Sequence, residues 1–503
     1  MADYTLALDQ GTTGSRAIVF DPEGNAVAQS SQTLRQIYPA PGWVEHDPAE
    51  IWHSQRLTAE QAVHQAGITA QDIHAIGIAN QRETTLLWER DSARPVYNAI
   101  VWQCRRSTPQ CERLMAQGLG PEVRARTGLV IDAYFSATKL QWLFEQVPDL
   151  QQRATRGELC FGTVDSWLVY QMTGGRLHIT DASNAARTML YNIHTGTWDP
   201  MLLEALQIPH EILPMVCPSS HVYGLTEPSA FLGSALPIAG MVGDQQAALF
   251  GHACFSPAMA KQTYGTGGFL LLHTGTTPVP SRHGLLTTVA WDLGARTDYA
   301  LEGSVFIAGA VIQWLRDGLQ LIPSAQASAA IAAEASDTNG VYFVPAFVGL
   351  GAPYWDPHAR GTIVGLTRGV NRSHLVRAAL EAIAYQTRDV LEAMQQDAGI
   401  RVPEMRVDGG AAGNTFLLQF QADILGIPLV RAQSVETTAR GAAYLAGLAT
   451  GVWSSLADIA AQWQGEVRYM PRMSAARRED LYAGWRRAIE RAKAWASPDM
   501  GDP

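Results

Sequence analysis

The sequence predicts an α/β protein built from two domains, and three observations support this fold class. The chain has 503 residues, more than a single hydrophobic core usually accommodates. Strand and helix patterns alternate along most of its length, which is typical of sheets covered by helices. A glycine- and threonine-rich hairpin near the N-terminus is also echoed about 254 residues later, close to half of the chain. This echo suggests a duplicated architecture with a cleft between the copies.

The first predicted element is a β-hairpin over residues 6–21, LALDQGTTGSRAIVFD. Two apolar runs flank a turn that carries glycines, hydroxyl side chains, Asp9 and Arg16. Glycine permits close backbone approach, and successive N–H groups form an anion-binding nest. The turn is a candidate phosphate site, although ordinary turns favour the same residues. A P-loop is excluded because none of the lysines, at positions 139, 261 and 493, follows a glycine.

Helix and strand patterns follow in alternation. Residues 50–67 predict a helix ended by Gly67, and residues 73–81 predict a buried strand. The second hairpin is predicted at residues 259–275, MAKQTYGTGGFLLLHTG. Glycine and proline interrupt the pattern at 250–258, where we expect the domain boundary.

The second half continues with two strong helical segments. Residues 373–399 predict a long helix with Ser373 as its cap and Gly399 as its stop. Residues 406–426 predict a strand, a glycine turn and a helix. Apolar residues near helical spacing predict a packed face close to the C-terminus: Leu481, Trp485, Ile489 and Trp495.

Composition and charge exclude several classes of protein. The net charge of −10 and the isoelectric point near 5.7 argue against a nucleic-acid-binding surface. The longest strongly apolar run, residues 305–315, is too short to cross a bilayer. Five scattered cysteines without a C-x-x-C pair, and an N-terminus without a secretory pattern, predict buried thiols in a cytoplasmic protein.

Polar residues stand out at the ends of two predicted strands. Asp244 lies between a predicted strand and a helix, a position where aspartate is most often an N-cap. Arg82 and Glu83 follow the buried strand at 73–81 and, as a pair, would usually be structural.

Other candidates are aromatic or glycine-rich. Trp102, Tyr134 and Phe269 are possible ligand contacts, although single aromatic residues more often pack in a core. Residues 407–416, VDGGAAGNTF, place glycines at the start of a helix, which favours phosphate groups and close backbone approach.

Taken together and in order, these segments resemble the FGGY carbohydrate kinases, and within that family the members that phosphorylate glycerol. The resemblance covers nearly the whole chain, and matches this long and this ordered are specific. It implies two actin-like (ribonuclease H-like) domains with a catalytic cleft between them. Residues 1–252 would bind glycerol and phosphate, and residues 253–503 would bind the nucleotide. The segments that carry the resemblance are residues 7–16, 38–48, 80–85, 98–106, 134–146 (with Lys139 and Trp142), 243–251, 263–267, 349–369 and 407–411.

The resemblance also implies roles for the two hairpins and the nucleotide side. The first hairpin would wrap the transferring phosphates of ATP, with Arg16 compensating their charge, while Asp9 would hold Mg²⁺ through water. The phosphate-binding residues would be Thr12, Thr13 and Gly14 from the first hairpin and Thr266 and Gly267 from the second, and the nucleotide would lie along Gly309, Gln313, Gly410 and Asn414.

For the acceptor side, the resemblance implies ATP-dependent phosphorylation of glycerol to sn-glycerol 3-phosphate. Asp244 would accept the proton of the attacking hydroxyl. The residues that would bind glycerol hydroxyls are Arg82, Glu83 and Asp244, assisted by Tyr134 and Gln245, with Trp102 and Phe269 against the carbon chain.

Three alternatives remain open at this point. A kinase of the same family acting on another small polyol or sugar is the nearest alternative. An actin-like ATPase without kinase activity is more distant, since fold does not fix function. A catalytically idle glycerol sensor would not need both phosphate loops and Asp244. We expect a homodimer or homotetramer, with no nucleic-acid partner and no membrane insertion.

A last expectation concerns regulation. Many bacterial members of the family are inhibited by fructose 1,6-bisphosphate, which binds between subunits at a glycine-rich loop carrying an arginine. The aligned loop here, residues 227–240, keeps Gly233 but has Ala235 in place of the arginine, and it contains no Lys or Arg. Charge-assisted contacts are the strong ones for a bisphosphate. We therefore expect weak or absent inhibition.

Overall fold

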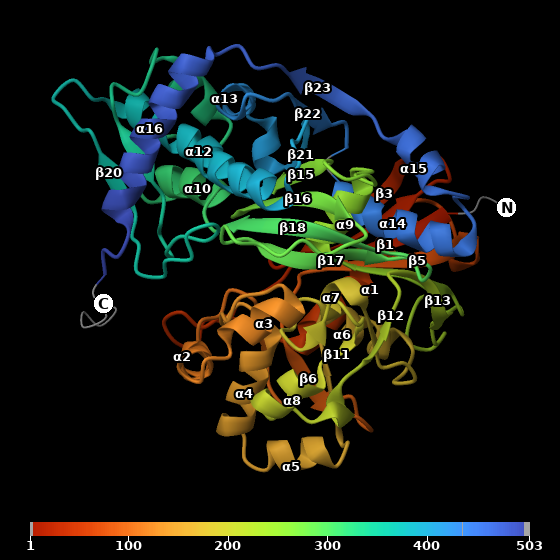
Figure 1. Ribbon diagram of the computed structural model, residues 1–503. Coiled ribbons are helices and arrows are strands. Elements are labelled where there is room, and N and C mark those ends of the chain that lie inside the picture. Colours follow the sequence, from red (N-terminus) through yellow and green to blue (C-terminus); the bar gives the residue numbers. More distant parts are fainter. Residues whose placement is uncertain (1–3, 435, 497–503) are drawn as a thin grey trace.

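Two mixed β-sheets form the core of the computed structural model, which describes residues 4–434 and 436–496 (Figure 1). The first sheet has the strand order β13-β14-β5-β1-β2-β3, and the second has the order β17-β18-β16-β15-β21-β22-β23. The strands of the first sheet are β1 (Tyr4–Gln10), β2 (Gly14–Phe20), β3 (Ala26–Thr33), β5 (Ile73–Asn80), β13 (Ser220–Leu225) and β14 (Pro237–Gly243). Those of the second are β15 (Ala260–Tyr264), β16 (Gly268–Gly275), β17 (Leu286–Asp292), β18 (Thr297–Val305), β21 (Met405–Gly409), β22 (Leu429–Ala432) and β23 (Gly465–Tyr469).

The two sheets repeat one arrangement. In each, an antiparallel hairpin, β1–β2 or β15–β16, is extended on one side by a third antiparallel strand, β3 or β18. On the other side lie two parallel strands, β5 and β14 in the first sheet and β21 and β22 in the second. The duplicated α/β architecture predicted from the echo of the hairpins is therefore confirmed.

Helices cover the sheets much as the sequence patterns predict. Helix α1 (Pro48–Gln65) packs on β2 and β3, and helix α12 (Arg372–Ala398) packs on β16 and β18. Asn371, whose side chain accepts hydrogen bonds from the backbone of two following residues, caps α12, so the expectation that Ser373 is the cap is wrong. The stop is as predicted, because Gly399 has a φ of 63°. The other helices of the second half include α10 (Gly309–Asp317), α11 (Ala327–Ala333), α13 (Thr415–Leu425), α15 (Leu456–Gln462) and α16 (Ala475–Ala492).

A helical lobe is inserted between β5 and β13 of the first half and lies at the bottom of Figure 1. Short strands connect its helices, and its own apolar core includes Phe135, Leu140 and Phe161. The lobe and its flanking segments contain α2 (Thr108–Ala116), α3 (Gly120–Thr127), α4 (Ser136–Gln146), α5 (Leu150–Thr155), α6 (Val164–Met172), α7 (Ala182–Ala185) and α8 (Pro200–Leu206). Its short strands are β6 (Leu86–Glu89), β7 (Ala99–Ile100), β8 (Leu159–Gly162), β9 (Ile179–Asp181), β10 (Tyr191–Asn192), β11 (Thr197–Trp198) and β12 (Met215–Cys217). Outside the lobe, β4 (Glu45–His46) pairs with β7, and β19 (Tyr342–Val344) pairs with β20 (Thr362–Val364) in the second half.

One helix crosses from the second half to the first. Helix α14 (Thr437–Thr450) follows β22, yet it packs on β1, β5 and β14 and on α9 (Asp244–Gly251). The approach is close enough to require glycine, because a Cβ on Gly441 would lie 1.9 Å from the carbonyl oxygen of Ala247. Residues of both sheets and of α14, among them Val242, Leu271 and Leu445, belong to one apolar cluster. The two halves therefore share part of their core.

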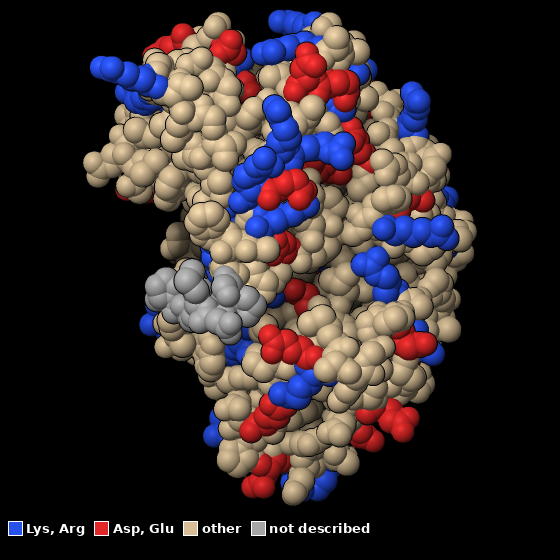
Figure 2. Space-filling view, turned by 60° about the vertical axis from the view of Figure 1, so that its left-hand side comes forward, with Lys and Arg blue, Asp and Glu red and all other residues tan. Residues whose placement is uncertain are grey.

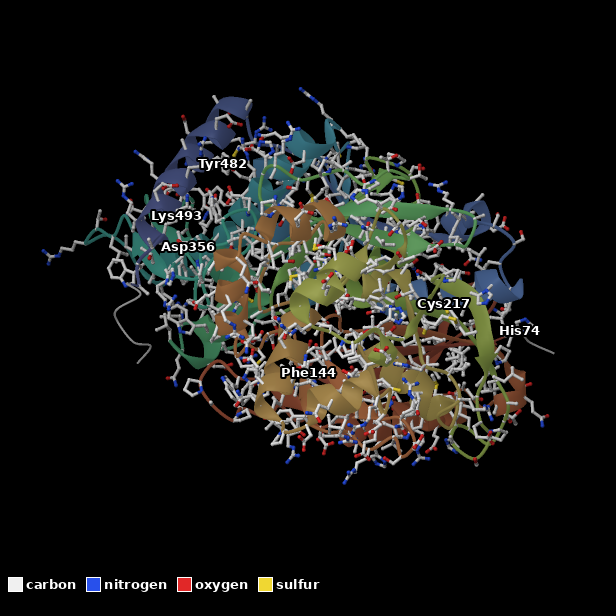
Figure 3. All side chains as sticks on the ribbon, turned by 60° about the horizontal axis from the view of Figure 1, so that its bottom comes forward. His74, Phe144, Cys217, Asp356, Tyr482 and Lys493 are labelled. Atoms are coloured by element: carbon white, nitrogen blue, oxygen red, sulfur yellow. The ribbon has the colours of Figure 1, made fainter. Side chains whose placement is uncertain are left out.

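Helix α16 closes the second half near the C-terminal end of the chain. Trp485 and Ile489 are buried, as the predicted packed face requires, whereas Trp495 lies beyond the helix and is 65% exposed. The periodic series therefore ends before Trp495. Figure 3 shows Lys493 of this segment near Asp356, whose carboxylate accepts a hydrogen bond from the backbone of Ala494.

The distribution of charged side chains on the surface and the state of the cysteines agree with what the composition predicts. On the described residues of the face in Figure 2, basic and acidic side chains are intermixed, and the group of basic side chains in the upper half of the view has acidic ones among it. All five cysteines are buried and free. Within residues 4–434 and 436–496, none of the helices has the length and apolar character needed to cross a membrane.

Candidate active site

Each hairpin has a turn closed by one backbone hydrogen bond, although the first turn is one residue longer than the second. The N–H of Gly11 donates to the carbonyl of Gly14, and the N–H of Gly265 donates to the carbonyl of Gly267, both at 2.9 Å. Thr13 and Thr266 are exposed at the tips, whereas Thr12 is half-buried. Each turn thus presents hydroxyl side chains beside a tight stretch of backbone.

A pair of charged side chains stands at the base of the first turn, whereas Thr263 and Phe269 form the corresponding pair in the second hairpin. Asp9 lies at the end of β1, and Arg16 lies opposite it on β2. Arg16 forms an ion pair with Glu436, at the start of α14. Burial, together with the nearby carboxylates of Asp244 and Glu436, raises the pKa of Asp9 to about 7 against the lowering effect of Arg16.

Arg82, Glu83, Arg187 and Glu302 form what we call the buried charge cluster. Arg82 donates from both terminal nitrogens to the carboxylate of Glu302, at 2.6 and 2.8 Å. Arg187 bridges the two acids, with its Nε 2.6 Å from Glu83 and its Nη2 3.1 Å from Glu302. The four side chains are at most 2% exposed. Two positive and two negative charges therefore compensate one another away from water.

The local backbone of this cluster is unusual. Glu83, just beyond β5, has a φ of 59° although it is not glycine. Such a conformation costs free energy and persists where surrounding contacts enforce it. Three contacts do so here: the Glu83 carbonyl accepts hydrogen bonds from Lys139 Nζ and Ser136 Oγ, and its side chain is paired with Arg187.

Trp102, Tyr134 and Phe269 form an aromatic cluster beside the charges. The ring of Trp102 packs edge-on against Tyr134 at 5.6 Å and against Phe269 at 6.2 Å. Tyr134 Oη lies 3.3 Å from Arg82 Nη2, and the indole N–H of Trp102 donates to Thr12 Oγ1 at 2.8 Å. The aromatic cluster therefore connects the charge cluster to the first hairpin.

Asp244 is the first residue of α9 and lies next to the charge cluster. The N-cap of α9 is Gly243, so the interpretation of Asp244 as the N-cap is wrong. The Asp244 carboxylate is 27% exposed and lies 3.3 Å from Arg82 Nε. Burial raises the pKa of this carboxyl, while Arg82 and Lys261 act in the opposite direction.

Gln245 and a lysine of the second half complete this region. Lys261 Nζ donates to the side-chain oxygen of Gln245 at 2.6 Å and to Thr263 Oγ1 at 2.9 Å. Burial lowers the pKa of Lys261 to about 8. Gln245 is thus already held by a hydrogen bond before any ligand binds.

The residues expected on the nucleotide side lie on two elements of the second half. Gly309 begins α10 and donates its N–H to Gly265 of the second hairpin, while Gln313 is exposed one turn later. Gly410 begins a 3₁₀ turn after β21, and Asn414 caps α13 and donates to Ser328 Oγ. Gly309 is therefore in direct contact with the second hairpin.

The structure brings together six of the residues singled out on the acceptor side: Arg82, Glu83, Trp102, Tyr134, Asp244 and Phe269. The sequence patterns did not identify the residues that contact these six, namely Arg187, Glu302, Lys261 and Gln246. The sequence does contain a sign of the pairing of Glu302, because a single acid within the apolar run YALEGSV must have a partner if the strand is buried.

Comparison with known proteins agrees with this geometry. The model of the FGGY family of carbohydrate kinases, N-terminal domain, matches residues 4–251, and that of the C-terminal domain matches residues 260–450. The chain belongs to the FGGY family of carbohydrate kinases. A glycerol kinase of Caldanaerobacter subterraneus subsp. tengcongensis is 58% identical over 496 residues, covering 99% of this chain and 100% of that protein. A glycerol kinase of Stenotrophomonas maltophilia is 60% identical, and the match covers 97% of each chain.

Solved structures support the same two-domain, actin-like fold of FGGY kinases. The crystal structure of Plasmodium falciparum glycerol kinase with ADP has a TM-score of 0.90 and 34% identity, covering 98% of each chain. A gluconate kinase from Lactobacillus acidophilus has a TM-score of 0.86 at 22% identity, covering 98% of this chain and 97% of that one, and bears on the fold alone.

Proposed function

We propose that this protein transfers the γ-phosphoryl group of ATP to glycerol and forms sn-glycerol 3-phosphate. The observation that carries the proposal is the meeting of Arg82, Glu83, Asp244 and the aromatic cluster beside the first hairpin. Glycerol has three hydroxyls and little apolar surface, so a site for it needs several hydrogen-bonding groups and a small apolar wall. Full-length identity of 57–60% to glycerol kinases such as those named above supports this acceptor.

Asp244 is the proposed base. The γ-phosphoryl group passes in line to a primary hydroxyl, and positioning and electrostatics dominate such a reaction. A carboxylate with a raised pKa, partly open to solvent, suits the acceptance of a proton from that hydroxyl. Arg82 Nε, 3.3 Å away, keeps the ionised form available.

The hairpins are proposed to hold the transferring phosphates. Thr12, Thr13 and Gly14 would act from the first half, and Thr266 and Gly267 from the second, with backbone N–H groups as donors. Arg16 would compensate phosphate charge, which requires it to share or leave its pairing with Glu436. Along the nucleotide we propose Gly309, Gln313, Gly410 and Asn414.

The residues present fit a magnesium ion at Asp9. The carboxylates of Asp244 and Glu436 disfavour the charged form of Asp9, and a cation beside Asp9 would favour it. Among the residues that the structure describes, no three acidic, imidazole or thiol groups converge enough to chelate an ion. This suits Mg²⁺, which keeps several waters and typically takes one or two carboxylates plus substrate phosphates. Bound there, the ion would neutralise phosphate charge.

The finer organisation is also proposed. We place the boundary between the two domains between residues 252 and 253, in the connection between α9 and β15. The outer ends of the two proposed domains, residues 1–3 and 497–503, lie outside the described residues. Five buried free thiols are what a protein of the reducing cytoplasm would carry. We further propose a homodimer or homotetramer.

The decisive experiment is ADP production by purified protein with and without glycerol. Glycerol-dependent release of ADP, with glycerol 3-phosphate as product, is expected. A panel of other polyols and sugars separates the closest alternative, a kinase for another acceptor. Glycerol-independent ADP release would instead favour an actin-like ATPase, and binding of glycerol without turnover would favour a sensor.

A further inference from the structure

We propose that Glu302 is a positioning residue of the acceptor site, which it serves from the opposite half of the molecule by fixing the orientation of Arg82. Glu302 lies on β18 of the second sheet, whereas Arg82 follows β5 of the first. Their contact joins residues 220 positions apart in the chain. The inference rests on the proposed function, because it concerns how that acceptor is held.

The hydrogen bonds of Arg82 define its orientation completely. Nη1 donates to Glu302 at 2.6 Å and to Gln246 at 3.1 Å, while Nη2 donates to Glu302 at 2.8 Å and to Tyr134 at 3.3 Å. The two terminal nitrogens thus make four hydrogen bonds to three residues, and a guanidinium has only five donors. The remaining donor, Nε, lies 3.3 Å from Asp244.

This bidentate pairing is rigid because of its geometry and its burial. A planar guanidinium and a carboxylate fix each other in distance and in plane. Glu302 is fully buried, and Arg187 and Arg82 lower its pKa to about 2 although burial alone would raise it. Glu302 therefore stays charged across the working pH range and does not release Arg82.

Arg187 links Glu302 to Glu83 and so fixes the orientation of the Glu83 side chain as well. It donates to Glu83 and to Glu302 at once, and its guanidinium carbon lies 5.6 Å from the ring centre of Tyr134. The two first-half acceptor residues, Arg82 and Glu83, are thus both oriented through one acid of the second half. The acceptor site is complete only when β18 is in place.

Without the charge of Glu302, Arg82 has a second carboxylate within reach. Asp244 is already near its Nε, so the freed guanidinium would turn toward Asp244 and pair with it more fully. The groups facing Asp244 are Arg82, Lys261, Glu302 and Asp9. Loss of the negative Glu302 and closer pairing with Arg82 both stabilise the ionised Asp244, so its pKa would fall.

The test is the Glu302→Gln variant, which keeps the shape but removes the charge. We expect the KM for glycerol to rise about 10- to 100-fold, as for loss of a charge-assisted contact, with the KM for ATP changed less than about twofold. The acidic limb of the rate profile should shift to lower pH. Glu302→Asp, which keeps the charge on a shorter side chain, should restore part of the glycerol KM.

Asp298→Asn is the matched control. Asp298 lies four residues earlier on β18, is also fully buried, and pairs with His273 and Arg296 rather than with the acceptor site. Its variant loses a buried carboxylate of the same strand but should keep the wild-type KM for glycerol and the wild-type pH profile.

Two results would overturn the inference: an unchanged glycerol KM in folded Glu302→Gln, or equal changes in the Asp298→Asn control. If Glu302→Gln does not fold, Glu302→Asp and Arg187→Lys decide, since both keep the charge balance and should still raise the glycerol KM. Wild-type protein that does not phosphorylate glycerol would instead contradict the proposed function, so the two failures are distinct.

Discussion

The two hairpins, β1–β2 and β15–β16, are alike in the pairing of their strands but differ in the charge near their turns. The first has Asp9 and Arg16 at the base of its turn, and Trp102 donates to its Thr12. In the second, the corresponding positions hold the uncharged Thr263 and Phe269, and the turn accepts backbone hydrogen bonds from Ala308, Gly309 and Ala310. Similar turns thus stand in different electrostatic surroundings.

This difference suggests a division of labour after duplication. The first hairpin lies beside Asp244 and the aromatic cluster, where charge must be balanced during transfer of the phosphoryl group. The second lies beside α10, where Gly309 contacts it and where we place the nucleotide. Each prediction below tests whether charged chemistry belongs to the first half and backbone-mediated binding to the second.

The largest effect is expected for Asp244→Asn. Shape and most hydrogen bonds survive, so glycerol should still bind, but turnover should fall by about 10²–10⁴-fold, the usual contribution of a positioned acid or base. Steady-state kinetics together with glycerol-induced thermal stabilisation would measure both. Near-normal turnover would remove Asp244 from the role of base.

Adding a methyl group to the turn of the second hairpin should impair the use of ATP. In Gly267→Ala, the new Cβ would lie 2.5 Å from the carbonyl oxygen of Val305, so the backbone of the turn must shift. Misplacement by about 1 Å can cost roughly 10²-fold in rate, and we expect a loss of this order in kcat/KM for ATP. Gly120→Ala is the control, since its Cβ meets no atom within 4 Å. Equal behaviour of the two variants would contradict the role of the turn.

Arg82→Ala should act mainly on the acceptor. We expect the glycerol KM to rise about 10- to 100-fold, as for loss of hydrogen bonds from a charged group, while the ATP KM stays near wild type. The variant also leaves Glu302 with one arginine fewer, so unfolding should become easier by about 3–5 kcal/mol. Thermal unfolding and kinetics would separate the effects, and equal changes in both KM values would make Arg82 purely structural.

A smaller effect is expected from pH. The pKa of Asp9 is raised to about 7, so the carboxyl is increasingly protonated as pH falls below 7. Magnesium and phosphate binding would require the ionised form, so the apparent KM for Mg·ATP should rise as pH falls, by at most tenfold per pH unit. Asp9→Asn should flatten this dependence, and a pH-independent KM in the wild type would exclude the assignment.

The smallest effect is expected for fructose 1,6-bisphosphate. The nearby cations already have partners: Arg176 pairs with Glu227, and Arg56 pairs with Glu60 at 2.6 Å in a surface pocket of about 410 Å³ beside Gly233. We expect no inhibition at millimolar effector in initial-rate assays with excess magnesium. Half-maximal inhibition below about 1 mM, an affinity near −4 kcal/mol, would show that other cations replace the missing arginine.

Local patterns predicted both hairpins and the C-terminal ends of the helices within residues 50–67, 373–399 and 406–426, because turn glycines and apolar periodicity act over a few residues. They placed the cap of α12 at Ser373, since they could not decide which of two neighbouring polar residues, Asn371 or Ser373, accepts the hydrogen bonds. They missed the pairing of Arg82 with Glu302 because no local pattern records a contact across 220 residues. The roles of Arg82, Asp244 and the phosphate turns came from the resemblance and remain predictions.

The crossing of α14 has a consequence for how the protein is made. The face of β1, β5 and β14 that α14 covers belongs to the first half of the chain, yet its cover is residues 437–450 of 503. During synthesis this apolar face stays uncovered until most of the polypeptide has left the ribosome. The first half therefore cannot reach its native state as an independent unit, although nascent domains generally fold one after another. A growing chain of this kind depends on being kept from aggregation until residues 437–450 have been made.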